Sequence, residues 1–220
     1  MEVCFLISGE TLTVLGDELQ GQTAQAVKKA LAAKVGISRF KQRFFVGDGS
    51  HEIQDDEGLD QVPLKIQLVV LEFWQPDDEE TRKMISAARE NDIVVLERLL
   101  QKPRNPNDTN SDGETPLFHA AEQGHVRLME ILLEAGAKTD QPEFARGWTP
   151  LMSAAAQGHL DTVCCLVEAG AAQDKTNAHG GTPLLVAAGN GHLDIVRFLV
   201  ESGAAKDQAE NNGATLLVDS

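Results

Sequence analysis

The chain has 220 residues, a net charge of −15 and three cysteines. Its length allows two domains of ordinary size. Residues 1–75 carry a net charge of −4 and residues 76–220 carry −11, which argues against a nucleic-acid partner, because nucleic acid needs a basic surface. No apolar stretch approaches the roughly 20 residues that span a membrane, and we expect no membrane contact. Three cysteines make no disulfide framework, and we expect reduced thiols in a cytoplasmic protein, with the nucleus as the alternative.

The first 74 residues predict an α+β domain. Short alternating or apolar runs indicate strands, and an apolar stripe between Thr23 and Gly36 indicates a helix. The predicted elements, in chain order, are a hairpin of strands 1–7 and 11–15, a helix over 23–36, a strand and turn over 43–49, and a strand over 64–71.

This order of elements resembles the ubiquitin-like β-grasp fold. The resemblance implies a binding face centred on an apolar residue of the third strand and a valine of the last strand, places held here by Phe44 and Val69. Gln67 replaces the histidine of that face. The last strand continues into Glu72–Pro76 instead of ending in a free Gly-Gly tail, which argues against a conjugated modifier. Phe44 is therefore a candidate partner anchor, with a plain core or edge role as the alternative.

A linker over 75–80 leads to a segment that repeats itself. The triplet Thr-Pro-Leu begins at Thr115, Thr149 and Thr182, at spacings of 34 and 33 residues, and a degraded copy begins at Thr215 after another 33 residues. Each intact copy is followed by Ala-Ala and then Gly-His. Such a period predicts an array in which each unit buries its apolar face against its neighbours.

One repeat reads as two helices and a turn. The threonine is predicted to cap the first helix and the proline to occupy its first position, where no N–H donor is needed. Gly-His ends that helix. A second helix with an apolar stripe follows, and Gly136, Gly170 and Gly203 are placed for left-handed caps.

These motifs resemble ankyrin repeats, which implies an all-α solenoid with short β-hairpin tips after the β-grasp domain. The family often has a histidine after Thr-Pro-Leu, whereas this chain has Phe118, Met152 and Leu185, so apolar packing must replace the family's Thr–His bond. The predicted divisions are a β-grasp domain over 1–74, a linker over 75–80, and repeats over 81–220: a degenerate one at about 81–109, full ones at about 110–143, 144–176 and 177–209, and a truncated one at 210–220.

The resemblance implies that partners contact the tips and the inner helix face. Trp148 and Arg146 are residue types common at binding hot spots, although Trp148 can equally pack across a neighbouring tip. The predicted partner-binding residues are Ser111, Asp112, Glu114, Glu122, Gln123, Arg146, Trp148, Gln157, His179 and Asn190, together with Phe44 of the first domain.

No residue pattern indicates catalysis, a metal or a cofactor. His125, His159 and His192 recur at the repeat period, so a structural role in the turns is expected. His51, His119 and His179 are interpreted as isolated. The predicted protein is a monomeric, non-catalytic adaptor that binds a protein partner, with a ubiquitin or proteasome connection through the β-grasp domain. A plain scaffold and the targeting region of a longer enzyme are the alternatives.

Overall fold

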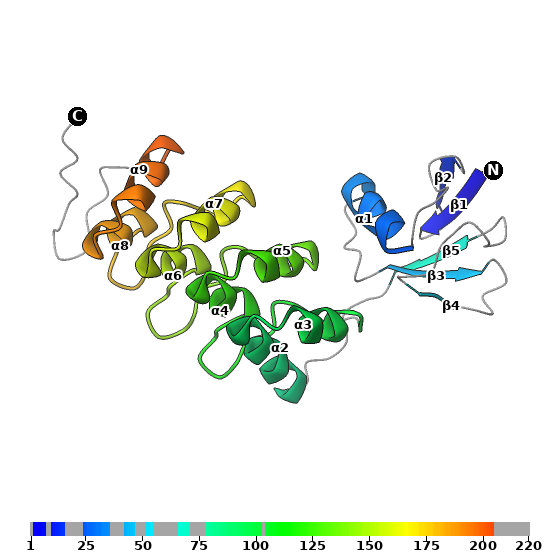
Figure 1. Ribbon diagram of the computed structural model, residues 1–220, viewed down its shortest axis with the longest axis horizontal. Coiled ribbons are helices and arrows are strands. Elements are labelled where there is room, and N and C mark those ends of the chain that lie inside the picture. The colour runs from blue at the N-terminus through cyan, green and yellow to red at the C-terminus, as the bar shows by residue number, and fades with distance from the viewer. Residues whose placement is uncertain are drawn as a thin grey trace. The chain divides into compact units, whose positions relative to one another are not determined.

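The computed structural model describes residues 2–7, 10–15, 24–35, 42–46, 52–54, 66–70, 78–102 and 104–204. The chain divides into two compact units (Figure 1): Met1–Trp74 with Gln101–Arg104, and Gln75–Leu100 with Asn105–Ser220. The predicted truncated repeat at 210–220 lies outside the described residues.

The first unit contains strands and one helix. β1 (Glu2–Ile7) and β2 (Glu10–Leu15) form an antiparallel hairpin, and α1 spans Ala24–Val35. β3 (Gln42–Val46) lies between β4 (Glu52–Ile53) and β5 (Ile66–Val70) and is antiparallel to both. β1 also contacts β5, so the two sheets are neighbours within this unit. β4 is not predicted from the sequence, because a strand of two residues is too short to show an alternating pattern.

The second unit is the predicted helical solenoid, which we call the repeat array. Its first helices α2, α4, α6 and α8 pack in one row and its second helices α3, α5, α7 and α9 in another (Figure 1). α2 begins inside the stretch predicted as a linker. The helices are α2 (Asp78–Glu90), α3 (Ile93–Leu100), α4 (Pro116–Gln123), α5 (Val126–Glu134), α6 (Pro150–Gln157), α7 (Leu160–Glu168), α8 (Pro183–Gly189) and α9 (Leu193–Glu201).

The threonine of each Thr-Pro-Leu triplet caps a first helix, as predicted. The Thr115, Thr149 and Thr182 hydroxyls accept hydrogen bonds of 3.1, 3.3 and 3.2 Å from the third backbone N–H that follows each of them. The next residue in each case is a proline at the start of the helix. A cap of this kind contributes about 1 kcal/mol to stability, so the triplet fixes where each first helix begins.

The core lies between the two rows of helices. Phe118 and Met152, which stand where the family often has histidine, are fully buried, and Leu185 is half-buried. Alanine pairs such as Ala120-Ala121 and Ala154-Ala155 are also fully buried. Apolar packing therefore occupies the position of the family's Thr–His bond, as the sequence predicts.

Successive repeats are joined by the recurring Gly-His pair. The His125, His159 and His192 side chains bond through Nε2 to backbone carbonyls of the preceding repeat, at 3.2, 3.1 and 2.9 Å. Gly158 has a left-handed φ of 80°, and a Cβ there would lie 2.7 Å from the His192 ring. The structural role predicted for these three histidines is confirmed, and the glycine leaves room for the next histidine.

None of the helices described in residues 24–35, 78–102 and 104–204 is long and apolar enough to cross a lipid bilayer.

Gly158→Ala should destabilise the array more than Gly170→Ala. Both glycines have positive φ (80° and 86°), so each alanine carries the left-handed backbone penalty of about 1–2 kcal/mol. Only the Cβ at Gly158 meets a neighbour, because nothing lies within 4 Å of the corresponding position at Gly170. Urea unfolding should give the lower midpoint for Gly158→Ala. Equal midpoints would show that the histidine contact does not constrain this glycine.

Candidate protein-binding surface

Three turns precede the first helices, and we call them the first tip (residues 110–114), the second tip (143–148) and the third tip (177–181). In the first tip the Asn110 side-chain oxygen accepts hydrogen bonds from the backbone of Asp112 and Glu114, both at 3.0 Å. Asn177 does the same in the third tip. Residues 104–204 contain no strand, so the predicted β-hairpins are not found there: each tip is a tight turn organised by one side chain.

Neighbouring tips are joined through their backbones. The Phe144 N–H donates to the Asp112 carbonyl at 2.8 Å, and the Ala178 N–H donates to the Arg146 carbonyl at 2.8 Å. Each tip is therefore fixed to the next one as well as to its own helix. This double attachment holds the three turns in register along one edge of the array.

The second tip is one residue longer than the other two, which accounts for the spacing of 34 residues between Thr115 and Thr149. Glu143 stands where the other tips have asparagine. Its carboxylate accepts hydrogen bonds from the backbone of Ala145 (2.7 Å), Arg146 (2.7 Å) and Trp148 (3.1 Å). A glutamate side chain is one methylene longer than asparagine and can bridge the longer turn.

Glu143 is a buried carboxylate held in its charged form. The residue is only 4% exposed, and burial acts to raise its pKa. The three backbone N–H donors and the nearby Arg146 charge outweigh burial, so the pKa lies below its ordinary value. The second tip is thus ordered around a permanent negative charge at neutral pH.

Arg146 and Trp148 are brought together, as a joint hot spot requires. The Arg146 guanidinium carbon lies 4.4 Å from the Trp148 ring centroid, which is a cation–π contact. Arg146 is exposed and Trp148 is half-buried. The indole thus supports the exposed arginine within the second tip, and a role for either residue in binding a partner stays a prediction.

Phe144 is a surface residue that the sequence pattern does not predict. It is 73% exposed, an unusual state for a large aromatic side chain. Its ring lies against Gly113 of the first tip, where an added Cβ would approach it to 2.5 Å. The spacing of 34 residues instead of 33 was the signal in the sequence that could have predicted this exposed side chain. A residue inserted into a tight turn has no equivalent in the other turns, so its side chain has no recurring packing position.

The other predicted surface residues of the array are accessible, and Asn190 also bonds to the Val186 carbonyl at 2.8 Å. Phe44 belongs to the first unit, where it lies in β3 opposite Ile53 and Leu68. The exposed residues are Ser111, Asp112, Gln123, Gln157, His179 and Asn190; the half-buried ones are Glu114 and Glu122.

The interpretation of His119 as isolated is wrong. Its side chain is buried in α4, and its ring nitrogens lie 2.9 Å from Glu114 and 3.4 Å from Glu122. The Arg89 guanidinium lies 3.4 and 3.5 Å from the two ring nitrogens. Glu114 lies in the first tip and His119 lies in α4, so helical periodicity could not predict that these two residues are in contact. This cluster fixes Glu114 and Glu122 in place on the surface.

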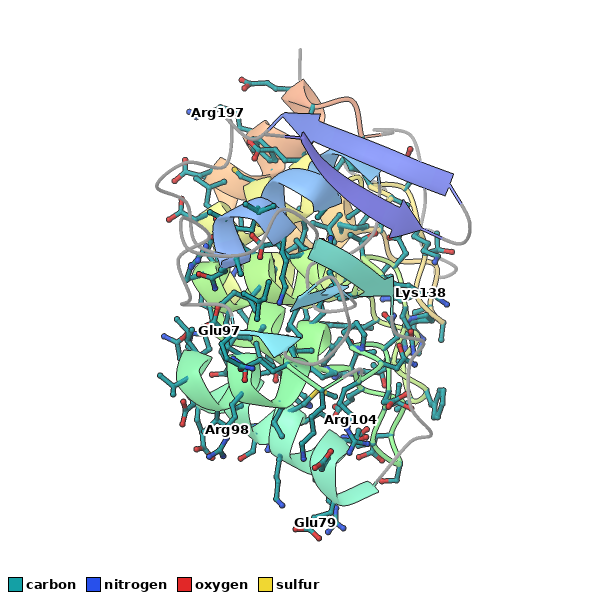
Figure 2. All side chains as sticks on the ribbon, turned by 90° about the vertical axis from the view of Figure 1, so that its right-hand side faces the viewer. Glu79, Glu97, Arg98, Arg104, Lys138 and Arg197 are labelled. Carbon is teal, nitrogen blue, oxygen red and sulfur yellow. The ribbon has the colours of Figure 1, made fainter. Side chains whose placement is uncertain are left out.

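The second helices face away from the tips and carry mixed charge. Glu97, Arg98 and Arg197 all lie along one side of the array in Figure 2, and Lys138 lies on the other. Arg127 of α5 pairs with Glu130 at 2.8 Å. Charge on this row is thus partly paired within single helices, and each of α5, α7 and α9 ends at an acidic residue: Glu134, Glu168 and Glu201.

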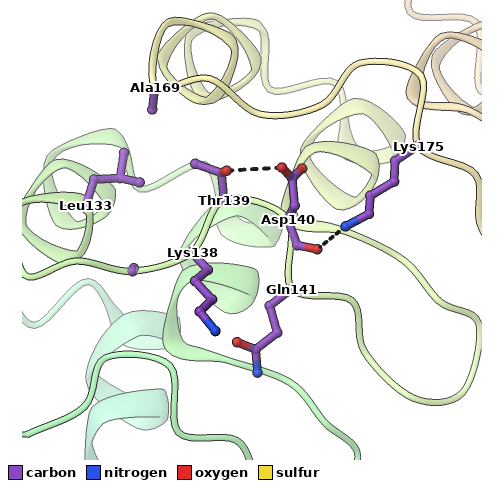
Figure 3. A pocket seen from close by; sticks show the side chains of 8 residues that line it. Leu133, Lys138, Thr139, Asp140, Gln141, Ala169 and Lys175 are labelled. Atoms are coloured by element: carbon purple, nitrogen blue, oxygen red, sulfur yellow. Dashed lines mark hydrogen bonds between the residues drawn. The ribbon is translucent and has the colours of Figure 1, made fainter. Parts of the chain in front are cut away.

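A pocket of about 860 Å³ lies between the loops that follow α5 and α7. Asp140 organises it. Its backbone carbonyl accepts a 2.8 Å hydrogen bond from the Lys175 side chain (Figure 3), and its side chain accepts one of 3.0 Å from the Ala172 backbone N–H. These contacts join two loops of successive repeats. The residues are already engaged with one another, which fits a joint between repeats better than a ligand site.

No metal site is found in the part of the chain that the structure describes, and the two adjacent thiols of α7 are not activated. No group of three or more His, Cys, Asp or Glu side chains there could hold a metal ion. Cys164 and Cys165 are free. Burial and nearby carboxylates raise the pKa of both thiols, which disfavours the nucleophilic thiolate.

Glu143→Gln should destabilise the array by about 2 kcal/mol at neutral pH, because an amide cannot accept all three backbone bonds and leaves donors unsatisfied. The lowered pKa of Glu143 means that its stabilisation is present above the ordinary glutamate pKa and is lost as the pH falls through the lowered value. Denaturant unfolding of both proteins across this range should show the difference shrinking in acid. A constant difference would refute the charged-anchor account.

Comparison with known proteins supports the repeat assignment. A family model for ankyrin repeats, three copies long, matches residues 84–177 and 166–220. Human ankyrin repeat domain-containing protein 39 is 39% identical over 59 residues, which is 27% of this chain and 32% of that protein. Mouse ankyrin repeat and SAM domain-containing protein 6 is 37% identical over 74 residues, 33% of this chain and 8% of that protein.

A fowlpox virus protein, putative ankyrin repeat protein FPV115, is 34% identical over 65 residues, 30% of this chain and 12% of that protein. The chain spans a third or less of the length of these curated relatives. The family model, in contrast, matches more than half of the chain and covers the capped helix pairs described above. The chain therefore belongs to the ankyrin-repeat family.

Proposed function

We propose that this protein is a non-catalytic adaptor that binds a protein partner through the tips and the ends of the inner helices. We call this the recognition surface; it consists of Ser111, Asp112, Glu114, Glu122, Gln123, Arg146, Trp148, Gln157, His179 and Asn190. The observation that carries the proposal is the backbone link between successive tips, at 2.8 Å in both cases. Family membership indicates a role in protein–protein interaction, and the linked tips supply a surface suited to it.

The physical advantage of such a surface is preorganisation. Binding costs free energy when loops and side chains must be ordered. Here Asn110, Glu143 and Asn177 already order the tips, and His119 holds two surface carboxylates. A partner therefore meets side chains that are largely in place. The energy of contact then contributes to affinity instead of to ordering the surface.

The charge of the recognition surface favours a partner with a basic end. The first tip presents Asp112 and Glu114, whereas the third presents His179 beside small residues. The repeat region carries most of the net negative charge. Long-range attraction of a basic segment raises the rate of encounter more than the final affinity.

For the first unit we propose a ubiquitin-like β-grasp domain over residues 1–74, connected to the repeats of 81–220. The order of strands and helix and the contact of β1 with β5 support this proposal. Phe44, in the strand between β4 and β5, is the proposed anchor for ubiquitin or proteasome machinery. In this arrangement a client bound by the repeats is brought to that machinery in the cytoplasm.

Affinity capture from cell extract with mass spectrometry tests both proposals: client binding by the recognition surface and partner binding through Phe44. Arg146→Ala with Asp112→Ala should lose the client, because two exposed contacts of the recognition surface are removed, and should keep the partners of the first unit. Phe44→Ala should show the reverse. Circular dichroism of each variant serves as the folding control. Retention of every partner by the Arg146→Ala/Asp112→Ala variant would refute the assignment of function to the tips. If Phe44→Ala captured the same partners as the unchanged protein, a plain scaffold would be favoured.

A further inference from the structure

Resting on the proposed function, we propose that the second tip is the anchor of the recognition surface and takes a partner segment in which a bulky apolar side chain stands beside a carboxylate. The apolar side chain packs on Phe144, and the carboxylate binds the Arg146 guanidinium. The observation behind this proposal is an exposed aromatic and an exposed cation on one rigid turn.

Phe144 is available for contact and is held in place. It is 73% exposed, its backbone N–H is bonded to the Asp112 carbonyl at 2.8 Å, and its ring lies over Gly113. The preceding residue, Glu143, is buried and bonded to three backbone N–H groups. An exposed aromatic on a rigid turn loses little conformational entropy on binding, and aromatic residues are enriched at hot spots.

Arg146 offers its charge to a partner. Its side chain is 53% exposed, and the Glu143 carboxylate, with which it forms a long ion pair, lies 3.9 Å from Nε. The hydrogen bonds of that carboxylate go to backbone N–H groups. Trp148 supports the guanidinium from one side at 4.4 Å. A planar guanidinium fixed in this way is suited to binding an incoming carboxylate through two parallel hydrogen bonds.

The position of Asp112 sets the order of charges along the partner segment. The backbones of Asp112 and Phe144 are hydrogen-bonded, so an exposed acidic residue of the first tip is joined directly to the residue that carries the exposed aromatic ring. A segment that crosses the two tips thus meets an acidic, an aromatic and a basic side chain. Its complement carries a basic residue, a bulky apolar residue and an acidic residue in that order, which combines the basic end favoured above with one carboxylate.

Two matched controls exist on the second helices. Leu193 of α9 is also 73% exposed, and Arg127 of α5 has a side-chain exposure of 55%, close to that of Arg146. Leu193→Ala removes an equally exposed apolar group, and Arg127→Gln removes an equally exposed positive charge. Both leave the second tip unchanged.

The test is selection of a random peptide library on the full chain, followed by titration of an enriched synthetic peptide with purified variants. We expect enriched peptides to carry an acidic residue close to an aromatic or large aliphatic one. Phe144→Ala and Arg146→Gln should each weaken binding about tenfold or more, and Leu193→Ala and Arg127→Gln should not. Added salt should weaken wild-type binding and have less effect on Arg146→Gln.

The outcomes separate this proposal from the proposed function. Enriched peptides without acidic residues, or peptides whose affinity is unchanged by Phe144→Ala and Arg146→Gln, would overturn the second tip as anchor. Failure to enrich any peptide would also overturn it, since the proposal requires recognition of a short segment. In either case, capture of a client that is lost with Asp112→Ala but kept by Phe144→Ala and Arg146→Gln would leave the proposed function standing.

Discussion

The structure of the repeat array depends on contacts between successive repeats. A helix pair of this size cannot bury its own apolar face and is stable only when stacked. The His159 and His192 rings pass over glycines of the preceding repeat and bond to its carbonyls. These contacts fix the spacing and rotation from one repeat to the next. Because the tips are attached to the same helices, that geometry also determines where the exposed side chains lie.

The second tip shows how a regular array acquires a specific feature. One inserted residue breaks the pattern of the other turns, and a glutamate replaces the asparagine that organises them. The free-energy cost of burying this carboxylate is offset by hydrogen bonds from three backbone N–H donors. The insertion also places Phe144 in solvent, two residues before the exposed Arg146. The departure from regularity and the most distinctive part of the surface are therefore the same few residues.

Much of the array could be predicted from the sequence because its determinants are local. Thr115, Thr149 and Thr182 cap helices through hydrogen bonds from the backbone N–H three residues later in the chain. The glycines with positive φ mark the helix ends directly. The contacts of His119 with Glu114 and Arg89 could not be predicted, since they join different elements. The exposure of Phe144 was missed for a similar reason: it depends on a neighbouring tip.

The tips are rigid before any partner binds, and hydrogen exchange of the Phe144 and Ala178 amides, which join successive tips, measures that rigidity. Both amides should be protected to about the same degree as amides in the middle of α4 and α6, and Glu143→Gln should lower the protection of the Phe144 amide. Exchange of these amides at the rate of an unstructured peptide would show instead that the tips become ordered only on binding.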